Sequence, residues 1–262
     1  MKKKSTGPLI IGHRGASARA PENTRAAFIK AIEAGADGLE FDVRLARDGV
    51  PVVFHDATLS RTGGVSAAVS DLTSDELSKI DIGSWFGRVH KRNIGEDFAS
   101  ETIPTLAQTL DLIGSFDGII FIELKCGERE VETLTEAVCA VLKGSPLLPN
   151  VILKSFKLAV ITRAKVHLPG IRTAALFAPK IMTILRKEKH LVKIAEEFGA
   201  DELSIHFSLA TRKLMEKAAK RNFPVNVWTA DSSRWVKRGT KLGLKSIITN
   251  DPAKLLARRA EI

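Results

Sequence analysis

Several features are scarce in this 262-residue sequence, and each scarcity excludes a class of protein. The only cysteines, Cys126 and Cys139, are too few for a disulfide framework and lack the spacing of metal ligands. A reducing cytoplasm is therefore the expected location. No apolar run approaches the ~20 residues that span a bilayer, so stable membrane insertion is not expected.

Aromatic residues are also scarce, at 6%, and they do not interleave with basic residues as in a groove for single-stranded nucleic acid. The formal net charge is +10, but the lysines and arginines are scattered. Solvated helix faces explain this distribution, with weak attraction of phosphate-bearing substrates as a second effect. We expect a small-molecule substrate and no nucleic-acid partner, and the sequence leaves the oligomeric state open.

Short apolar runs of strand length recur along the chain, and helical patterns separate most of them, which predicts βαβ units around parallel strands. The length fits one (β/α)8 barrel of ~250 residues, so we expect a single catalytic TIM-barrel domain over residues 1–262. The nine apolar runs are 8–12, 38–43, 50–54, 118–125, 150–155, 171–177, 201–206, 225–229 and 246–249. The expected helices are 24–34, 105–114, 129–142, 158–167, 181–198, 210–221, 232–242 and 252–259. Asn23 is the start signal expected for the first helix.

Nine strands are one too many for this barrel, and the third run explains the excess. No helix separates 38–43 from 50–54, and the intervening Asp48-Gly49 is a strong hairpin signal. The third run is therefore expected to be an antiparallel return arm, which leaves eight barrel strands. A two-residue turn would pair Arg47 with Val50 and place His55 opposite Asp42, whereas a longer turn would shift this register.

Residues 56–104 do not resemble a barrel unit. They contain Thr62-Gly63-Gly64, a helix-capping pattern from Thr73 to Glu76, and a loop-like stretch. We expect a small insertion of short helices and loops, which follows the second barrel strand and its hairpin arm and covers the C-terminal face of the barrel.

Three acidic residues lie near the ends of predicted barrel strands. Glu40 and Asp42 are two residues apart, so they share one face of their strand, and Glu123 sits in a similar alternating segment. Inward carboxylates at a barrel mouth repel one another unless a cation neutralises them, and oxygen ligands favour magnesium or calcium. The alternative is a set of salt bridges to Arg14, Arg44 and Lys125.

Two histidines also end predicted strands: His13 closes the first strand, and His55 closes the return arm. A single histidine at a strand end is more often a hydrogen-bonded core residue. Two histidines beside a metal site suggest a general acid and a general base, because imidazole titrates near neutral pH. Arg14, next to His13, offers a planar set of donors for a phosphate.

These motifs belong to an ordered set that runs along almost the entire chain. Its segments are His13-Arg14-Gly15, Pro21-Glu22-Asn23-Thr24, Glu40-Phe41-Asp42-Val43, Asp48-Gly49, His55-Asp56, Glu123-Leu124-Lys125, Ser155-Phe156, Val227-Trp228-Thr229 and Ile247-Ile248-Thr249-Asn250-Asp251-Pro252. The set resembles the glycerophosphodiester phosphodiesterase family, and its N-terminal part is the most specific.

The resemblance implies a TIM barrel with an insertion after the His55-Asp56 pair. It also implies hydrolysis of glycerophosphodiesters to glycerol 3-phosphate and an alcohol, with one divalent cation, magnesium or calcium, as cofactor. The residues it assigns are His13 and His55 as acid and base, Glu40, Asp42 and Glu123 as metal ligands, and Arg14, Glu22, Lys125 and Trp228 as substrate-binding residues.

Two other activities remain open on the same residues. A lysophospholipase D or a phosphoinositide-type lyase would act on a lipid, and the basic surface with Trp85 and Phe86 in the insertion permits it. A non-catalytic phosphate-binding barrel would be expected to lose some acid–base or metal residues, yet all five are present. Asp231 and Asn250 stand where relatives often carry asparagine and an acid, and neither is expected to contact the proposed site.

Overall fold

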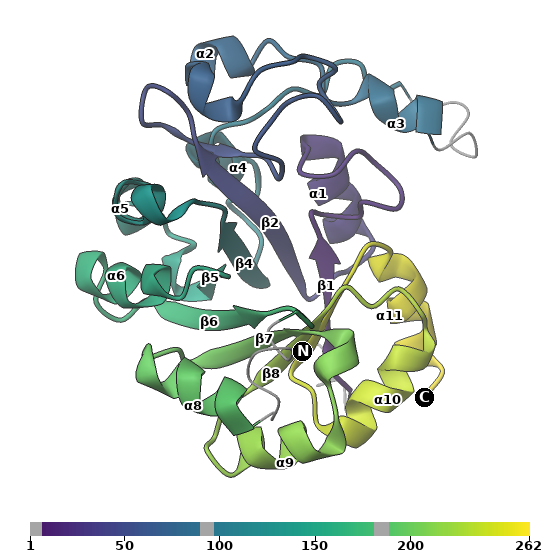
Figure 1. The fold of residues 1–262 in the computed structure, drawn as a ribbon. Coiled ribbons are helices and arrows are strands. Elements are labelled where there is room, and N and C mark those ends of the chain that lie inside the picture. Colours follow the sequence, from purple (N-terminus) through teal and green to yellow (C-terminus); the bar gives the residue numbers. More distant parts are fainter. Residues whose placement is uncertain (1–6, 90–96, 181–188) are drawn as a thin grey trace.

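The computed structural model describes residues 7–89, 97–180 and 189–262, and its eight parallel strands close into a barrel (Figure 1). The strands are β1 (Leu9–His13), β2 (Gly38–Leu45), β3 (Pro51–Val53), β4 (Ile119–Leu124), β5 (Val151–Ser155), β6 (Arg172–Phe177), β7 (Glu202–His206), β8 (Val225–Trp228) and β9 (Ser246–Thr249). Their order is β1-β9-β8-β7-β6-β5-β4-β2, and parallel pairing of β1 with β2 closes the ring. Because β3 pairs antiparallel with β2 and lies outside the closed ring of parallel strands, the predicted TIM barrel with a return arm is confirmed.

Helices surround the barrel strands (Figure 1). They are α1 (Arg25–Glu33), α4 (Leu106–Leu112), α5 (Val131–Lys143), α6 (Ala159–His167), α8 (Lys189–Glu197), α9 (Arg212–Ala219), α10 (Arg234–Leu242) and α11 (Pro252–Ala260). The predicted helix 181–198 is described only as α8, because residues 181–188 lie outside the described part of the chain. None of the described helices is long and apolar enough to cross a membrane.

The alternation of side chains along β2 creates both the core and the site. Leu39, Phe41 and Val43 pack in the layer between strands and helices, where the Phe41 ring lies 5.5 Å from the ring of Phe28 on α1. Burial of one such side chain stabilises the fold by roughly 1.5–3 kcal/mol. The intervening residues, Glu40 and Asp42, therefore face the barrel interior. The predicted orientation of these strand faces is confirmed.

The start of α1 differs from the sequence prediction. Thr24, and not Asn23, caps the helix, because its hydroxyl accepts a hydrogen bond from Ala27 N. Asn23 instead has a positive φ of 59°, and its side chain bonds Asp42 across the barrel mouth. A residue expected to be a helix cap thus supports the acidic cluster.

The hairpin between β2 and β3 is one residue out of the predicted register. Val43 pairs with Val53, and Ala46 N donates to Val50 O, so the turn contains three residues rather than two. The third turn residue is Gly49, whose φ of +78° suits a left-handed position. As a result Phe54, and not His55, lies opposite Asp42 and donates its N–H to Asp42 O.

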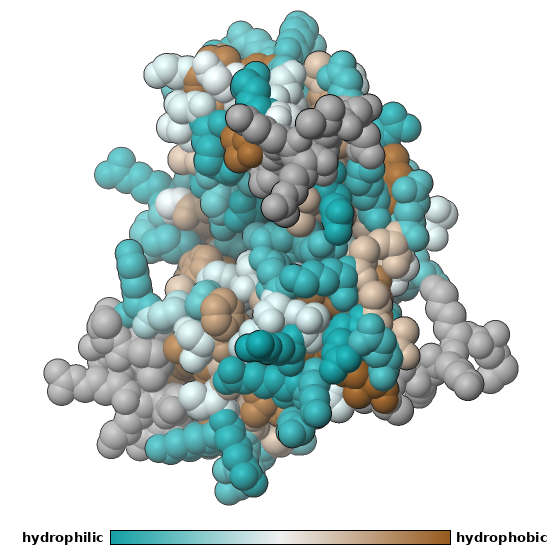
Figure 2. All heavy atoms as spheres, turned by 90° about the vertical axis from the view of Figure 1, so that its right-hand side faces the viewer, coloured by the Kyte–Doolittle hydropathy of each residue, from teal (hydrophilic) through white to brown (hydrophobic). Residues whose placement is uncertain are grey.

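The described residues between β3 and α4 include three short helices, η1 (Val69–Asp71), α2 (Ser74–Leu77) and α3 (Ser84–Val89), outside the helical ring (Figure 1). Apolar side chains of η1 and α2 share a cluster with the hairpin. This cluster contains Val52, Phe54, Leu59, Leu77 and Ile103 among others. The extent to which this segment covers the C-terminal face stays a prediction. The right-hand side of the molecule in Figure 1, which includes α10 and α11, is mostly hydrophilic, with hydrophobic residues in small separate areas (Figure 2).

Candidate active site at the barrel mouth

The turn after β1 brings the backbone close to α1. Gly15 has a φ of +80°, and a Cβ atom there would lie 2.5 Å from the backbone of Ala27, so only glycine fits. Arg14 precedes it in the left-handed region with a φ of 54°, and its N–H donates to Glu40 Oε2 at 3.1 Å. A strained residue held by a buried carboxylate marks this turn as part of the site.

Glu40, Asp42 and Glu123 meet at the C-terminal ends of neighbouring strands. Asp42 on β2 pairs in register with Glu123 on β4. All three side chains are buried, and one carboxylate oxygen from each lies within 4.8 Å of the others. An ion with metal–oxygen distances of about 2.3–2.6 Å can reach three oxygens at this spacing. The cluster is therefore compatible with a divalent metal ion.

Three cations lie among these acids. Arg14 Nε is 3.0 Å from Asp42 Oδ2, and Lys125 Nζ is 2.5 Å from Glu123 Oε1 and 3.3 Å from Asp42 Oδ1. Arg44, which the salt-bridge alternative also included, instead donates to the carbonyls of His55 and Lys125. The structure therefore combines the two alternatives from the sequence. The same acids form salt bridges with Arg14 and Lys125 and also cluster as metal ligands would.

The third cation, Lys154 on β5, was missed in the sequence analysis. Its Nζ lies 2.7 Å from Glu40 Oε1 and 3.9 Å from Glu123 Oε2, and its side chain is almost fully buried. The signal was available, because a lysine at an inward position of an apolar strand is stable only beside an acid. Lys154 thus faces Glu40 and Glu123, whereas the Arg14 side chain faces Asp42.

Burial and these charges shift the acids in different directions. Burial alone would raise the pKa of Asp42, but Arg14 and Lys125 outweigh it and lower this pKa well below its usual range. For Glu123, burial dominates and raises the pKa despite Lys125. A cation bound beside Glu123 would act against this shift, because a positive charge lowers the pKa of a neighbouring carboxyl group.

Each of the two histidines is oriented through its Nδ1. His13 Nδ1 lies 2.7 Å from Asn250 Oδ1, and its Nε2 lies 3.9 Å from Glu40 Oε2. His55 Nδ1 lies 2.6 Å from Asp56 Oδ1, and the charge of Asp42 acts on its ring. Burial lowers the pKa of both imidazoles. The expectation that Asn250 makes no contact with the site was wrong, because it directly contacts His13.

The residues expected to bind the substrate lie around the acidic cluster at the barrel mouth. Glu22 accepts hydrogen bonds from Arg14 at 2.8 Å and from Arg61 of the insertion at 2.6 Å. On the other side, the ring of Trp228 at the end of β8 lies 5.6 Å from that of Phe156, which is 44% exposed. Arg61 and Phe156 were not singled out as site residues from the sequence.

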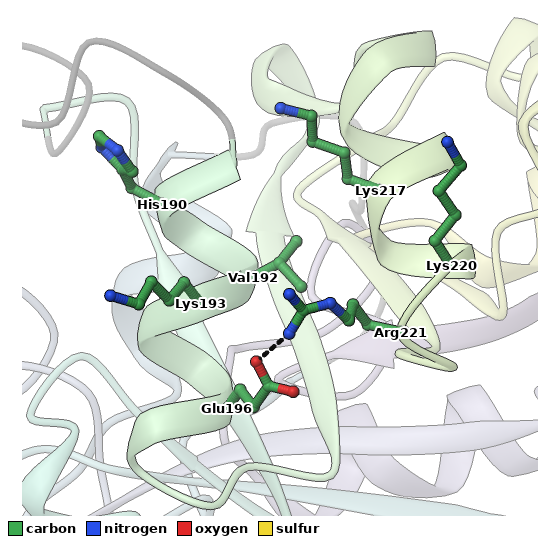
Figure 3. Close-up of a pocket in the computed structure, with 7 residues that line it drawn as sticks. All are labelled: His190, Val192, Lys193, Glu196, Lys217, Lys220 and Arg221. Carbon is green, nitrogen blue, oxygen red and sulfur yellow. Dashed lines mark hydrogen bonds and ion pairs between the residues drawn. The ribbon is translucent and has the colours of Figure 1, made fainter.

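Apart from the site at the barrel mouth, a hollow lies on the outside of the barrel, between α8 and α9 (Figure 3). Four cations line it, and one of them, Arg221, pairs with Glu196 across the groove. Its lining comes from helix surfaces and not from the C-terminal ends of strands, where active sites of this fold lie. These cations therefore fit the solvated helix faces expected from the sequence.

Buried acids, cations and imidazoles at the mouth of a parallel barrel define a TIM-barrel enzyme that acts on phosphate groups. Residues 13–254 match the model of the glycerophosphoryl diester phosphodiesterase family. A glycerophosphodiester phosphodiesterase of Caldanaerobacter subterraneus subsp. tengcongensis is 34% identical over 95% of this chain and 96% of its own length.

Two solved structures share the fold over nearly the whole chain. A phosphodiesterase from Oleispira antarctica, in complex with the product sn-glycerol 3-phosphate, has a TM-score of 0.84 and 28% identity over 97% of both chains. A glycerophosphodiester phosphodiesterase from Thermotoga maritima has a TM-score of 0.73 and 27% identity over 96% of this chain and 97% of its own. This chain belongs to the glycerophosphoryl diester phosphodiesterase family, and the enzyme class expected from the sequence is confirmed.

Proposed function

We propose that the chain hydrolyses glycerophosphodiesters to glycerol 3-phosphate and an alcohol, with chemistry at His13, His55 and the three acids. One observation carries the proposal: Glu40, Asp42 and Glu123 meet at a barrel mouth beside both imidazoles. The relative from Oleispira antarctica provides a precedent, because glycerol 3-phosphate is the product in its structure.

Glu40, Asp42 and Glu123 would hold one divalent cation, magnesium or calcium. Their carboxylate oxygens suit a hard ion, and their spacing within 4.8 Å fits one ion. Such an ion neutralises charge on the phosphate oxygens as a Lewis acid. Arg14 and Lys125 add fixed positive charge beside it, so the chain itself contributes to stabilising the transition state.

His13 takes a proton from the nucleophile, and His55 donates a proton to the departing alcohol. The reverse assignment uses the same two positions. The nucleophile is either water or the glycerol hydroxyl of the substrate, and the second route passes through a cyclic phosphate. Detection of that cyclic phosphate during turnover separates the two routes.

Arg14, Lys125, Glu22 and Trp228 bind the substrate in this proposal. Arg14 and Lys125 face the position of the phosphate, and Glu22 lies between Arg14 and Arg61. Within the described residues, Trp228 Nε1 is buried without a hydrogen-bond acceptor, so it is free to donate to a bound substrate. The insertion reaches the site through Arg61, which supports its proposed place over the C-terminal face.

Alanine substitutions of the two histidines test the proposal. His13→Ala and His55→Ala should each lower kcat by about 100-fold or more, because each removes one proton-transfer group. His167→Ala is the matched control, since His167 contacts Glu132 on the outer helices. Near-normal turnover in both site variants would refute the assignment.

A lysophospholipase D activity is the second candidate, and exposed Phe156 beside Trp228 favours it by offering an apolar ring at the mouth. Trp85 and Phe86 do not support it, because they pack in a cluster between the insertion and α1 and Phe86 is fully buried. A lipid substrate predicts faster turnover of lysophosphatidylcholine than of glycerophosphocholine, and a selective loss of the lipid reaction in Phe156→Ala.

We also place the enzyme in the cytoplasm, acting on a small molecule rather than a nucleic acid. Its two cysteines support this location, because Cys126 and Cys139 are both free thiols in the structure. Fractionation of the native cells, with the chain detected by antibody, tests the location directly.

A further inference from the structure

We propose that Asp231 decides which nitrogen of His13 carries the proton, and that it acts through Asn250. Asp231 and Asn250 are positioning residues in this account, because Asn250 contacts the imidazole and the Asp231 carboxylate bonds Asn250 and Thr249. The inference rests on the proposed role of His13 in proton transfer, but the proton position on the ring can be measured independently of activity.

Asn250 follows β9, and its side-chain amide lies between two groups. Its Nδ2 donates to Asp231 Oδ2 at 2.8 Å, and its Oδ1 lies 2.7 Å from His13 Nδ1. The hydroxyl of Ser17 also donates to Asn250 Oδ1, at 2.9 Å. The amide thus links a carboxylate that follows β8 to the imidazole that ends β1.

The Asp231 carboxylate determines which group donates and which accepts in each hydrogen bond from Asp231 through Asn250 to His13. An ionised carboxylate only accepts hydrogen bonds, so the amide must turn its NH2 toward Asp231 and its oxygen toward His13. That oxygen also only accepts, and therefore His13 Nδ1 must carry the hydrogen. In the neutral ring, Nε2 then holds the lone pair, on the side where Glu40 Oε2 lies at 3.9 Å. The ring is set to accept a proton from the side of the acidic cluster.

Asp231 is itself rigidly held. Its Oδ1 accepts from Asn250 N at 2.8 Å and from the Thr249 hydroxyl at 2.9 Å. An asparagine at position 231 would keep these two bonds through its own oxygen, but its NH2 would then face the NH2 of Asn250. Rotation of the Asn250 amide removes this conflict, and it also presents an NH2 to His13 Nδ1. The hydrogen of the ring would move to Nε2, where it blocks proton acceptance.

The reciprocal exchange restores every bond. In the double variant Asp231→Asn with Asn250→Asp, a carboxylate at 250 accepts from His13 Nδ1 and from the amide at 231. The amide oxygen at 231 still accepts from the backbone at 250 and from Thr249. The single variant Asn250→Asp instead places two carboxylates at the 2.8 Å contact, so it should lower the thermal unfolding temperature.

The test combines turnover with nitrogen NMR of histidine-labelled protein. We expect Asp231→Asn to lower kcat by about 100-fold with KM within about twofold, and to move the His13 hydrogen from Nδ1 to Nε2. The double variant should recover both kcat and the Nδ1–H signal. Asp201→Asn is the matched control, because Asp201 bonds Thr173 and Lys165 at the other end of the barrel and should leave both readouts unchanged.

Two results would overturn the inference. One is an Asp231→Asn protein whose His13 keeps its hydrogen on Nδ1, and the other is a double variant that recovers neither signal nor turnover. A failure of the proposed function looks different: His13→Ala would remain active, while the proton position in the variants still followed Asp231.

Discussion

Lys154 Nζ lies 2.7 Å from Glu40 Oε1 at the mouth of the barrel, and the two side chains are only 2% and 1% exposed. Buried ions lose their hydration, so each is tolerated largely because the other is present. The pair also fixes one oxygen of Glu40 at the edge of the acidic cluster, while Glu40 Oε2 accepts from Arg14 N. Glu40 therefore both stabilises the buried Lys154 and belongs to the acidic cluster of the site.

Replacing Lys154 by methionine should destabilise the metal-free protein. The change keeps the length of the side chain but leaves Glu40 buried without its partner, which costs about 3 kcal/mol in the free energy of unfolding. Urea denaturation after chelation measures this loss. Lys165→Met is the control, since Lys165 pairs with Asp201 at the surface and should cost less than about 1 kcal/mol. An equal loss in both variants would contradict the interpretation.

The pH dependence of kcat/KM should reflect the shifted imidazoles. Burial lowers the pKa of both His13 and His55 below the usual histidine value of about 6.5. Protonation of whichever one acts as the base removes activity at low pH, so the half-point of this decrease in kcat/KM should lie below about pH 6.5. A half-point above about pH 6.5 in the free enzyme would show that these pKa values are raised, not lowered.

The three-residue hairpin turn gives a prediction with an internal control. Gly49 and Gly144 both have open space where a Cβ atom would lie, but φ is +78° at Gly49 and −92° at Gly144. Gly49→Ala should therefore lower the free energy of unfolding by about 1 kcal/mol, whereas Gly144→Ala should be neutral or slightly stabilising. Thermal melts of both variants provide the measurement, and equal melting temperatures would argue against the strained turn.

The fold was largely predictable because its signals are local. Alternating apolar residues fixed the strands, and the short Asp48-Gly49 connection identified β3 as a return arm. The register of that arm was not predictable to one residue. Asp48 accepts hydrogen bonds from the backbone and hydroxyl of Ser74, and this contact joins segments 26 residues apart. Sequence patterns at the turn contain no information on such a partner.

The site was predictable where a motif gave both the residue type and the strand position, as for Glu40 and Asp42. Residues that act through spatial neighbours were missed. The inward position of Lys154 was a local signal, but its acidic partners lie on other strands: β5 lies beside β4, where Lys154 pairs in register with Glu123. Asn250 and Asp231 were not expected to contact the site, because Asn250 bonds His13 across 237 residues of sequence and Asp231 bonds Asn250. Closure of the barrel, and not local sequence, creates these contacts.

The central claim is that Glu40, Asp42 and Glu123 hold a divalent ion required for phosphodiester hydrolysis. The most direct measurement is the release of glycerol 3-phosphate from glycerophosphocholine after chelation, followed by titration with magnesium or calcium. We predict that chelation lowers turnover by about 100-fold or more, that one of the ions restores it, and that Asp42→Asn abolishes this recovery. Full turnover by chelated protein in which elemental analysis detects no divalent ion would contradict the account.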